Sequence, residues 1–210
     1  MTLATDFVQA AEPDSRWLMV VLHGLGDSME GYRWLPEEMG LPWLNYLLVN
    51  APDPYFTGYS WFDFPGDPMP GVRRSYQLLS QLLDDQRQAG FPTHQTFMFG
   101  FSQGCLMTWV TGVKYPHRLA GCIGISGFLP DPEALLRERS SMAQHQHFLI
   151  THGTMDPLLP FAAAKAQVQK MQAAGLQIEW HEFDKPHTIA GSLEMAVIRR
   201  FVQRRRTAPS

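Results

Sequence analysis

The pentapeptide at residues 100–104, Gly-Phe-Ser-Gln-Gly, is the feature that most limits how this chain can fold. It directly follows an apolar run at residues 95–99 that is typical of a buried strand, and it precedes a helical pattern that begins at Cys105. Small residues on both sides of the serine permit a tight turn from strand to helix, which lifts the hydroxyl clear of the sheet. A chance Gly/Ser turn is the alternative, and the strand and helix on either side argue against it. We therefore take Ser102 as a candidate nucleophile.

Short apolar runs alternate with helical patterns along the chain. This order predicts a mostly parallel sheet that is covered by helices on both faces. We expect strands at residues 17–22, 44–50, 95–99, 119–126, 147–151 and 176–183, with a short antiparallel edge strand at 6–10. Apolar stripes at helical spacing, which we expect to face the core, lie at residues 72–83, 161–171 and 193–201.

A serine needs two partners, because its hydroxyl is a weak nucleophile until a base removes its proton and a third group orients that base. When the serine lies on such a turn, the acid and then the histidine follow it along the chain, on loops after later strands. The loop at residues 152–157, His-Gly-Thr-Met-Asp-Pro, follows an expected strand and presents Asp156. Glu179 and Glu182 lie inside the next expected strand, so Asp156 is the better candidate for the acid.

Two of the eight histidines, His181 and His187, follow Asp156 in the chain. His181 falls within the alternating run at residues 176–183, whereas His187 lies in the loop just beyond it. We therefore expect Ser102 as nucleophile, His187 as general base and Asp156 as the orienting acid. This order of residues on a mostly parallel sheet predicts the α/β-hydrolase fold, without a large cap domain.

The oxyanion of an acyl-transfer intermediate needs backbone amides that are already in place. One donor should be the amide of Gln103, the residue after the nucleophile. The second should come from the loop at residues 23–27, His-Gly-Leu-Gly-Asp, where we expect the amide of Leu25, with Gly24 as the alternative. We interpret His23 as a hydrogen-bonding brace for this loop.

The segment at residues 51–71 is dense in proline, glycine and aromatic residues, and it is too long to be only a connection. We interpret it as a binding loop in which some of the aromatic rings form an apolar wall for an acyl chain. These rings belong to Tyr59, Trp61, Phe62 and Phe64. Leu158, close to the candidate acid, is expected to contact the substrate as well. Packing of the rings into the core beneath the loop is the alternative.

Composition argues against several other classes of protein. Hydrophobic residues at 45% and charged residues at 18% are ordinary for a globular chain, and no linker divides residues 1–210, so we expect a single domain. The formal net charge is −3 and no basic stripe is interleaved with aromatics, which argues against nucleic acid as a partner. His145 and His147 form a close pair without further ligands at suitable spacing, so we expect no metal and no cofactor.

The cysteines and the chain termini bear on the compartment. Cys105 and Cys122 both lie in apolar stretches, which predicts buried thiols in a reducing environment rather than a disulfide. The first residues lack the pattern of a signal peptide, and no apolar run approaches the length of a membrane span. We therefore expect a cytoplasmic protein without stable insertion into a membrane.

Five motifs together resemble the phospholipase/carboxylesterase family that includes acyl-protein thioesterases. They are HGLGD at 23–27, SWFD at 60–63, GFSQG at 100–104, HGTMDPLLP at 152–160 and the histidine of KPH at 185–187. The resemblance implies cleavage of carboxylic esters or thioesters through a covalent acyl-enzyme, with Ser102, Asp156 and His187 as the triad and Leu25 and Gln103 at the oxyanion hole. Departures lie at Cys105, where the family usually has a second glycine, and at residues 64–71 and 184–186.

The motifs and the resemblance predict a serine hydrolase that acts on small to medium acyl groups. A lactonase or peptidase on the same fold is the enzymatic alternative, and a non-catalytic binding protein on a hydrolase scaffold is the alternative from another class. The expected partner is a small-molecule ester or an acylated substrate. A homodimer is left open by the sequence.

Overall fold

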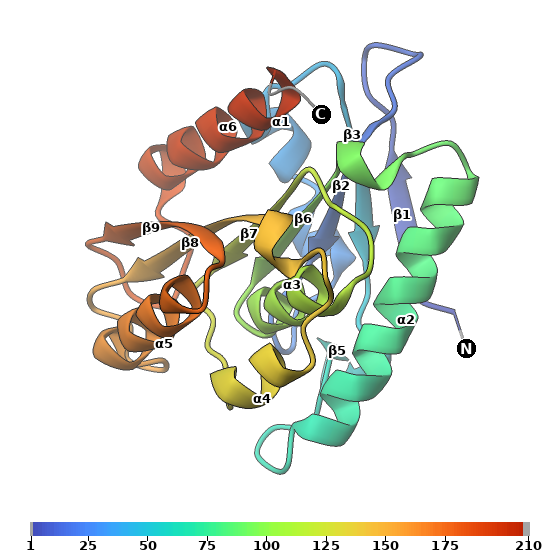
Figure 1. The fold of residues 1–210 in the computed structure, drawn as a ribbon. Coiled ribbons are helices and arrows are strands. Elements are labelled where there is room, and N and C mark those ends of the chain that lie inside the picture. Colours follow the sequence, from blue (N-terminus) through green and yellow to red (C-terminus); the bar gives the residue numbers. More distant parts are fainter. Residues whose placement is uncertain (1, 208–210) are drawn as a thin grey trace.

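The computed structural model describes residues 2–207 and places a seven-stranded sheet at the centre of the molecule (Figure 1), with the strand order β1-β3-β2-β6-β7-β8-β9. The strands are β1 (Thr5–Val8), β2 (Trp17–Leu22), β3 (Leu44–Val49), β6 (Thr96–Phe101), β7 (Gly121–Ile125), β8 (His147–Gly153) and β9 (Gln177–Phe183). All neighbouring strands are parallel except β1, which runs antiparallel to β3 at one edge. The predicted parallel sheet and its antiparallel edge strand are confirmed.

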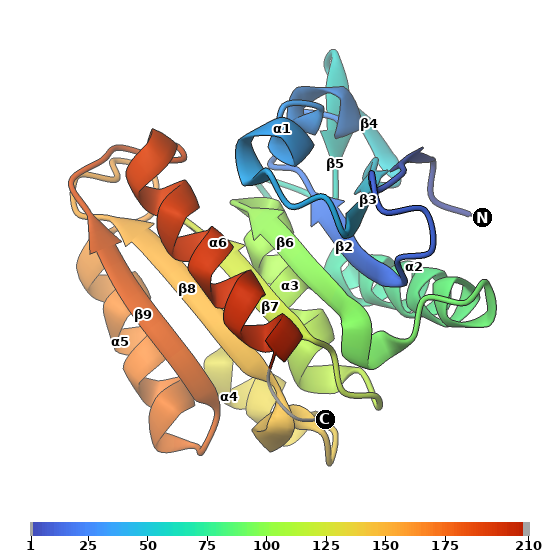
Figure 2. The ribbon, with the colours of Figure 1, turned by 90° about the horizontal axis from the view of Figure 1, so that it is seen from above.

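Helices cover both faces of this sheet (Figure 2). On one face lie α1 (Leu35–Met39) and α6 (Gly191–Thr207). On the other lie α2 (Met69–Gln88), α3 (Gln103–Lys114) and α5 (Phe161–Ala173), with the short α4 (Pro132–Arg137) against α3 and α5. Short 3₁₀ turns lie at Met29–Tyr32, Thr93–Gln95 and Ala143–His145. The two shortest α-helices were not predicted, because five or six residues hardly repeat a helical pattern.

The central strands are apolar along their length because both of their faces are covered. In β2, Leu18, Val20 and Leu22 pack in the core cluster that includes α2 and α3, while Met19 and Val21 pack in the cluster beneath α1 and α6. Within residues 2–207, no helix is long and apolar enough to cross a membrane.

The apolar stripe of the last helix differs from the prediction at its first position. Leu193 is 73% exposed, whereas Met195 and Ile198 are buried against the sheet. Leu193 lies in the first turn of this helix, where the neighbouring Glu194 and Met195 take the buried positions. The side chain of Leu193 therefore points to solvent although its spacing fits the stripe.

The aromatic segment contains a hairpin, β4 (Asp53–Tyr55) and β5 (Gly58–Ser60), although its composition did not predict regular strands. Two backbone hydrogen bonds of 2.9 Å join the hairpin to the loop after β2: Gly26 N donates to Tyr59 O, and Tyr59 N donates to Asp27 O. The hairpin is thereby held next to the carboxyl end of β2. In open parallel sheets this edge, where the parallel strands end, is where ligands bind.

Candidate active site

Ser102 occupies the turn between β6 and α3. Its backbone φ is 55°, a strained value for a residue other than glycine, and its amide donates to Ile125 O at 2.9 Å. A Cβ atom at Gly100 would lie 2.1 Å from the carbonyl oxygen of Gly104, and one at Gly104 would lie 2.2 Å from that of Leu22. Both glycines are therefore required for the close contact of strand, turn and helix that presents the serine.

Three side chains from distant parts of the chain meet at this turn. His187 Nε2 lies 3.0 Å from Ser102 Oγ, and His187 Nδ1 lies 2.7 Å from Asp156 Oδ2. The other carboxylate oxygen of Asp156 accepts hydrogen bonds of 2.9 Å from the amides of Leu158 and Leu159. The structure thus brings together all three residues that the sequence predicts for the triad, in the geometry of nucleophile, base and orienting acid.

The environment of Asp156 keeps it ionised. Burial raises the pKa of this carboxyl, but the hydrogen bonds from the Leu159 amide, from His187 and from the Leu158 amide outweigh burial, so its pKa lies below the ordinary value. An ionised carboxylate next to His187 Nδ1 can stabilise the positive charge that forms on the imidazole during proton transfer.

Two other histidines near this site have different surroundings. His181 lies in the middle of β9, in register with Thr151 of β8, so it does not reach the edge where the strands end. His152 is fully buried, and its Nε2 lies 2.9 Å from Leu159 O and 3.7 Å from Asp156 Oδ2. Burial lowers the pKa of His152, which favours a neutral ring behind Asp156. The sequence assigned no role to His152, although it begins the loop that carries the acid.

Leu25 and Gln103 both line the cavity above Ser102. Within residues 2–207, neither backbone amide has a hydrogen-bond acceptor. Gln103 is the first residue of α3, and amides in the first turn of a helix have no acceptor within that helix. Two amides without acceptors thus belong to residues that line the same cavity as Ser102, and their role as an oxyanion hole stays a prediction.

The loop that carries Leu25 is braced by His23, as expected. The amide of Ala51 donates to His23 Nε2 at 3.0 Å, so this nitrogen carries no proton, and Nδ1 then donates to Gly24 O at 2.6 Å. Burial also lowers the pKa of His23, which favours this neutral form.

Trp61 is not part of a substrate-binding wall, and the prediction that it contacts substrate is wrong. Its side chain is fully buried in the core cluster beneath the loop, and its indole Nε1 donates to His23 O at 2.9 Å. Its amide donates to Gln103 Oε1 at 2.9 Å, and its carbonyl accepts from Ser75 Oγ at 2.6 Å. Trp61 therefore links the loop of the candidate oxyanion hole to α2 and α3 from below.

An apolar cavity of about 420 Å³ opens above Ser102 and His187. Its wall is formed by Gly24, Leu25, Asp27, Phe62, Phe64, Phe101, Ser102, Gln103, Phe128, Leu158, Leu159 and His187. Of the five residues predicted to contact substrate, Phe62, Phe64 and Leu158 lie in this wall, whereas Tyr59 and Trp61 do not. Phe128 was missed, although its place just after β7 is a usable signal, because the parallel strands end at the same edge.

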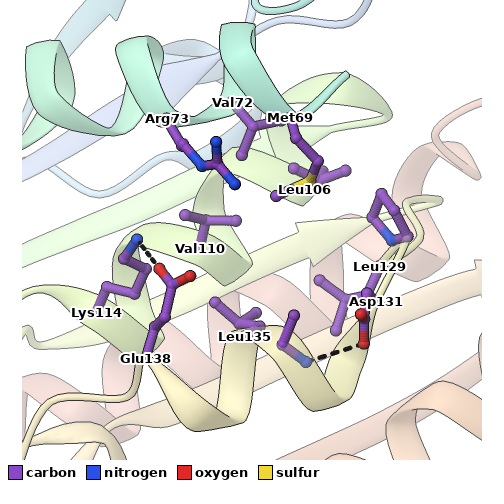
Figure 3. Close-up of a pocket in the computed structure, with 12 residues that line it drawn as sticks. Met69, Val72, Arg73, Leu106, Val110, Lys114, Leu129, Asp131, Leu135 and Glu138 are labelled. Atoms are coloured by element: carbon purple, nitrogen blue, oxygen red, sulfur yellow. Dashed lines mark hydrogen bonds and ion pairs between the residues drawn. The ribbon is translucent and has the colours of Figure 1, made fainter. Parts of the chain in front are cut away.

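A further cavity lies between α2, α3 and α4, away from these side chains (Figure 3). Val72 and Val110 are among its apolar lining residues, and an ion pair between Lys114 and Glu138 lies on one side (Figure 3). Its volume of about 40 Å³ suits a water molecule or two rather than an acyl chain.

Other reactive groups lie apart from this chemistry. Cys105 and Cys122 are buried free thiols, as predicted, and burial raises the pKa of Cys105 to about 12, which keeps it protonated. Within residues 2–207, no three histidine, cysteine, aspartate or glutamate side chains are grouped so that they could hold a metal ion.

Residues 3–205 match the family described as Phospholipase/Carboxylesterase. Acyl-protein thioesterase 1 of Schizosaccharomyces pombe is 32% identical to this chain over 164 residues, which cover 72% of this chain and 73% of that protein. A probable carboxylesterase of Oryza sativa subsp. japonica is 29% identical over 191 residues, which cover 83% and 72% of the two chains.

Solved structures agree with the fold. The crystal structure of esterase PE8 has a TM-score of 0.88 and 26% sequence identity, with 97% of this chain and 99% of that chain covered. The crystal structure of Arabidopsis thaliana SOBER1 has a TM-score of 0.83 and 24% identity, with 91% and 99% covered. The predicted α/β-hydrolase fold is confirmed.

Proposed function

Because the chain belongs to the phospholipase/carboxylesterase family and is a carboxylic ester hydrolase, we propose that it cleaves acyl esters and thioesters through an acyl-enzyme on Ser102. One observation carries this proposal: the hydrogen bonds that run from Ser102 Oγ through the ring of His187 to Asp156. A serine on a strained turn, a base at 3.0 Å and an ionised acid behind the base are the parts that acyl transfer needs.

In the first half of the proposed reaction, Ser102 Oγ attacks the carbonyl carbon while His187 Nε2 takes the hydroxyl proton. The amides of Leu25 and Gln103 donate to the oxyanion of the tetrahedral intermediate. When the intermediate collapses, the bond to the alcohol or thiol breaks, and this leaving group takes the proton from His187. The acyl group stays on Ser102.

In the second half, a water molecule gives a proton to His187 and attacks the acyl carbon. The second intermediate then collapses, the carboxylic acid leaves, and Ser102 Oγ regains its proton from the imidazole. Throughout both halves, the carboxylate of Asp156 holds His187 Nδ1–H and keeps Nε2 directed at the serine.

The apolar cavity supports a small to medium acyl group as the substrate. Phe62 lies at the buried part of its wall, while Phe64 and Leu158 are 58% and 68% exposed where the cavity meets solvent. An acyl chain enclosed there gains about 0.8 kcal/mol for each buried methylene. The relatives named acyl-protein thioesterase and carboxylesterase support thioesters and oxygen esters, respectively.

The test is hydrolysis of p-nitrophenyl esters from acetate to octanoate and of matching thioesters, combined with labelling by a fluorophosphonate. Ser102→Ala should lower turnover by roughly 10³-fold or more and abolish labelling while the fold is kept. Ser141→Ala, an exposed serine outside the site, is the matched control and should behave as wild type. A folded Ser102→Ala protein with wild-type turnover would refute the acyl-enzyme mechanism.

A further inference from the structure

An ion pair is buried beside the loop between β9 and α6, residues 184–190, which carries His187 and is called the histidine loop here. Lys185 Nζ lies 2.7 Å from both carboxylate oxygens of Glu194, and the two side chains are only 3% and 0% exposed. The pair Lys165–Glu182, by contrast, has side chains that are 43% and 37% exposed. Because removal of two charges from water costs free energy, a buried pair is weak evidence for stability alone, and its position suggests another role.

Glu194 connects the two ends of the histidine loop. Its Oε2 accepts a hydrogen bond of 2.6 Å from the amide of Ala190, in addition to the contact with Lys185. Lys185 lies two residues before His187, and Ala190 lies three residues after it. One carboxylate, fixed in the first turn of α6, therefore binds the chain on both sides of the histidine.

Lys185 also contacts the loop that carries the acid. Its carbonyl oxygen accepts a hydrogen bond of 3.2 Å from the amide of Met155, the residue before Asp156. The charged groups that interact electrostatically with its ammonium are Glu194 from α6 and Asp156 from the loop after β8. Burial lowers the pKa of Lys185, and attraction to Glu194 and to Asp156 opposes this effect.

The histidine loop has one apolar anchor after His187: the partly buried Ile189, which packs against the core cluster beneath α1 and α6. Asp184, Pro186 and Thr188 are exposed, so apolar packing contributes little before His187. Residues 184–186 are also one of the places where the sequence departs from the family pattern noted above. The only strongly buried side chain among residues 184–188 is that of Lys185.

We propose that the Lys185–Glu194 pair is a positioning device that holds His187 Nε2 at Ser102 and Nδ1 at Asp156. The proposal rests on the proposed function, because it assigns the pair a role through the base of that reaction. Neither residue touches the reacting atoms. The pair acts by fixing the loop between the acid and the helix, so that the imidazole is already oriented before substrate binds.

The test compares four variants: Lys185→Met, Glu194→Gln, the double variant with both changes, and Lys165→Met as the matched control from the exposed pair. The double variant matters because each single change leaves a buried partner unpaired, which can prevent folding, whereas removal of both charges is often neutral for stability. Each folded variant is measured for kcat and KM with p-nitrophenyl butyrate, for the rate of fluorophosphonate labelling, and for Tm.

We expect the double variant to fold with a Tm near that of wild type but to lose about 10- to 100-fold in kcat, with KM changed by less than about twofold. Labelling should slow by a similar factor, since it needs the activated serine but no substrate contacts. The far-downfield proton resonance of a His187 Nδ1–H bound to Asp156 should be present in wild type and lost in the double variant. Lys165→Met should match wild type in every measurement.

A folded double variant with wild-type kcat, labelling rate and downfield resonance would overturn the proposal and leave the pair a purely structural role. The resonance separates this failure from failure of the proposed function. If wild type neither hydrolyses esters nor reacts with the fluorophosphonate, the proposed function fails. The resonance still tests whether the pair orients His187: its retention in the double variant counts against the positioning role, and its loss supports that role.

Discussion

The serine side and the histidine side of the site are held by different forces. Ser102 stands between β6 and α3, which are buried almost throughout, and its turn is bonded to β7 through the backbone. His187 stands in a loop that polar contacts hold, among them the buried Lys185–Glu194 pair, with the partly buried Ile189 as its apolar contact. The serine side thus takes its geometry from core packing, and the histidine side takes most of it from hydrogen bonds and charge.

This difference separates the expected effects of substitution. A change in the packing that supports the serine turn should lower stability and activity together, because the same packing supports both. A change on the histidine side that leaves no buried charge unpaired should lower activity while most of the stability remains.

The largest effect is expected on the histidine side, for His187→Ala. Without a base the serine keeps its proton, so kcat should fall by roughly 10³-fold or more, while the thermal midpoint changes little. The measurement is ester hydrolysis together with thermal unfolding. His181→Ala, in the middle of β9, is the control and should retain wild-type activity. Loss of activity in His181→Ala but not in His187→Ala would mean that the base is the other histidine.

On the serine side, Trp61→Ala should lower both the free energy of unfolding and the activity. Removal of a fully buried tryptophan should cost about 3–5 kcal/mol of unfolding free energy, and it leaves the carbonyl of His23 without its donor. Because Trp61 supports the oxyanion loop and does not contact substrate, acetate and octanoate esters should lose activity equally.

Urea unfolding and kcat/KM for the two esters measure these effects. Trp34→Ala, which removes an exposed tryptophan, should cost clearly less stability. A loss confined to octanoate with an unchanged unfolding free energy would restore the acyl-wall role for Trp61.

A smaller effect on the free energy of unfolding is expected for Asp156→Asn, and this effect depends on pH. The lowered pKa of Asp156 means that its ionised form stabilises the folded state. This contribution is present above the unfolded pKa of about 4 and is lost as pH falls through the lower folded value. Asp156→Asn should therefore be less stable than wild type near pH 7, and the gap should narrow below about pH 4. Urea unfolding at both pH values checks the sign, and a gap that widens in acid contradicts it.

The smallest effect is expected at the rim of the cavity, for Leu158→Ala. Leu158 is 68% exposed, so only part of its side chain can contact an acyl chain. We expect kcat/KM to fall by a few-fold for octanoate and not at all for acetate. One fully buried methylene is worth a factor of about four, and the loss should stay below that factor because Leu158 is only partly in contact with the acyl chain. Leu193→Ala, 73% exposed on α6 and outside the cavity, is the control. Equal losses for both esters would remove Leu158 from the acyl site.

The three residues of the candidate triad were predictable because the sequence requirements for a serine turn, and for the order of its partners along the chain, are local and strict. A serine between two glycines, after a strand and before a helix, leaves few folds open, and chain order then restricts the acid and the base. The structure brings Ser102, Asp156 and His187 to one edge of the sheet, since parallel strands all end there. His187 was separable from His181 by position alone, because one follows the strand and the other lies within it.

The aromatic segment was not predictable to the same degree. Residues 51–71 have no sustained period of two or of 3.6, so the sequence does not say which rings point inward. The direction of the rings is set by the hairpin, which is hydrogen-bonded to the loop after β2. Trp61 is buried beneath that loop, and the next residue, Phe62, lies in the wall of the cavity.

The sequence by itself determined the parallel sheet, the serine turn and the candidate triad, because periodicity, small residues and chain order each act over short distances. Only the tertiary structure decided which side chains line the cavity and which charges pair. Lys185 and Glu194 look like ordinary surface charges in the sequence, since charged residues are rarely buried. They are buried because α6 turns back onto the loop after β9, and the electrostatic environment that results exists only once those distant segments have packed.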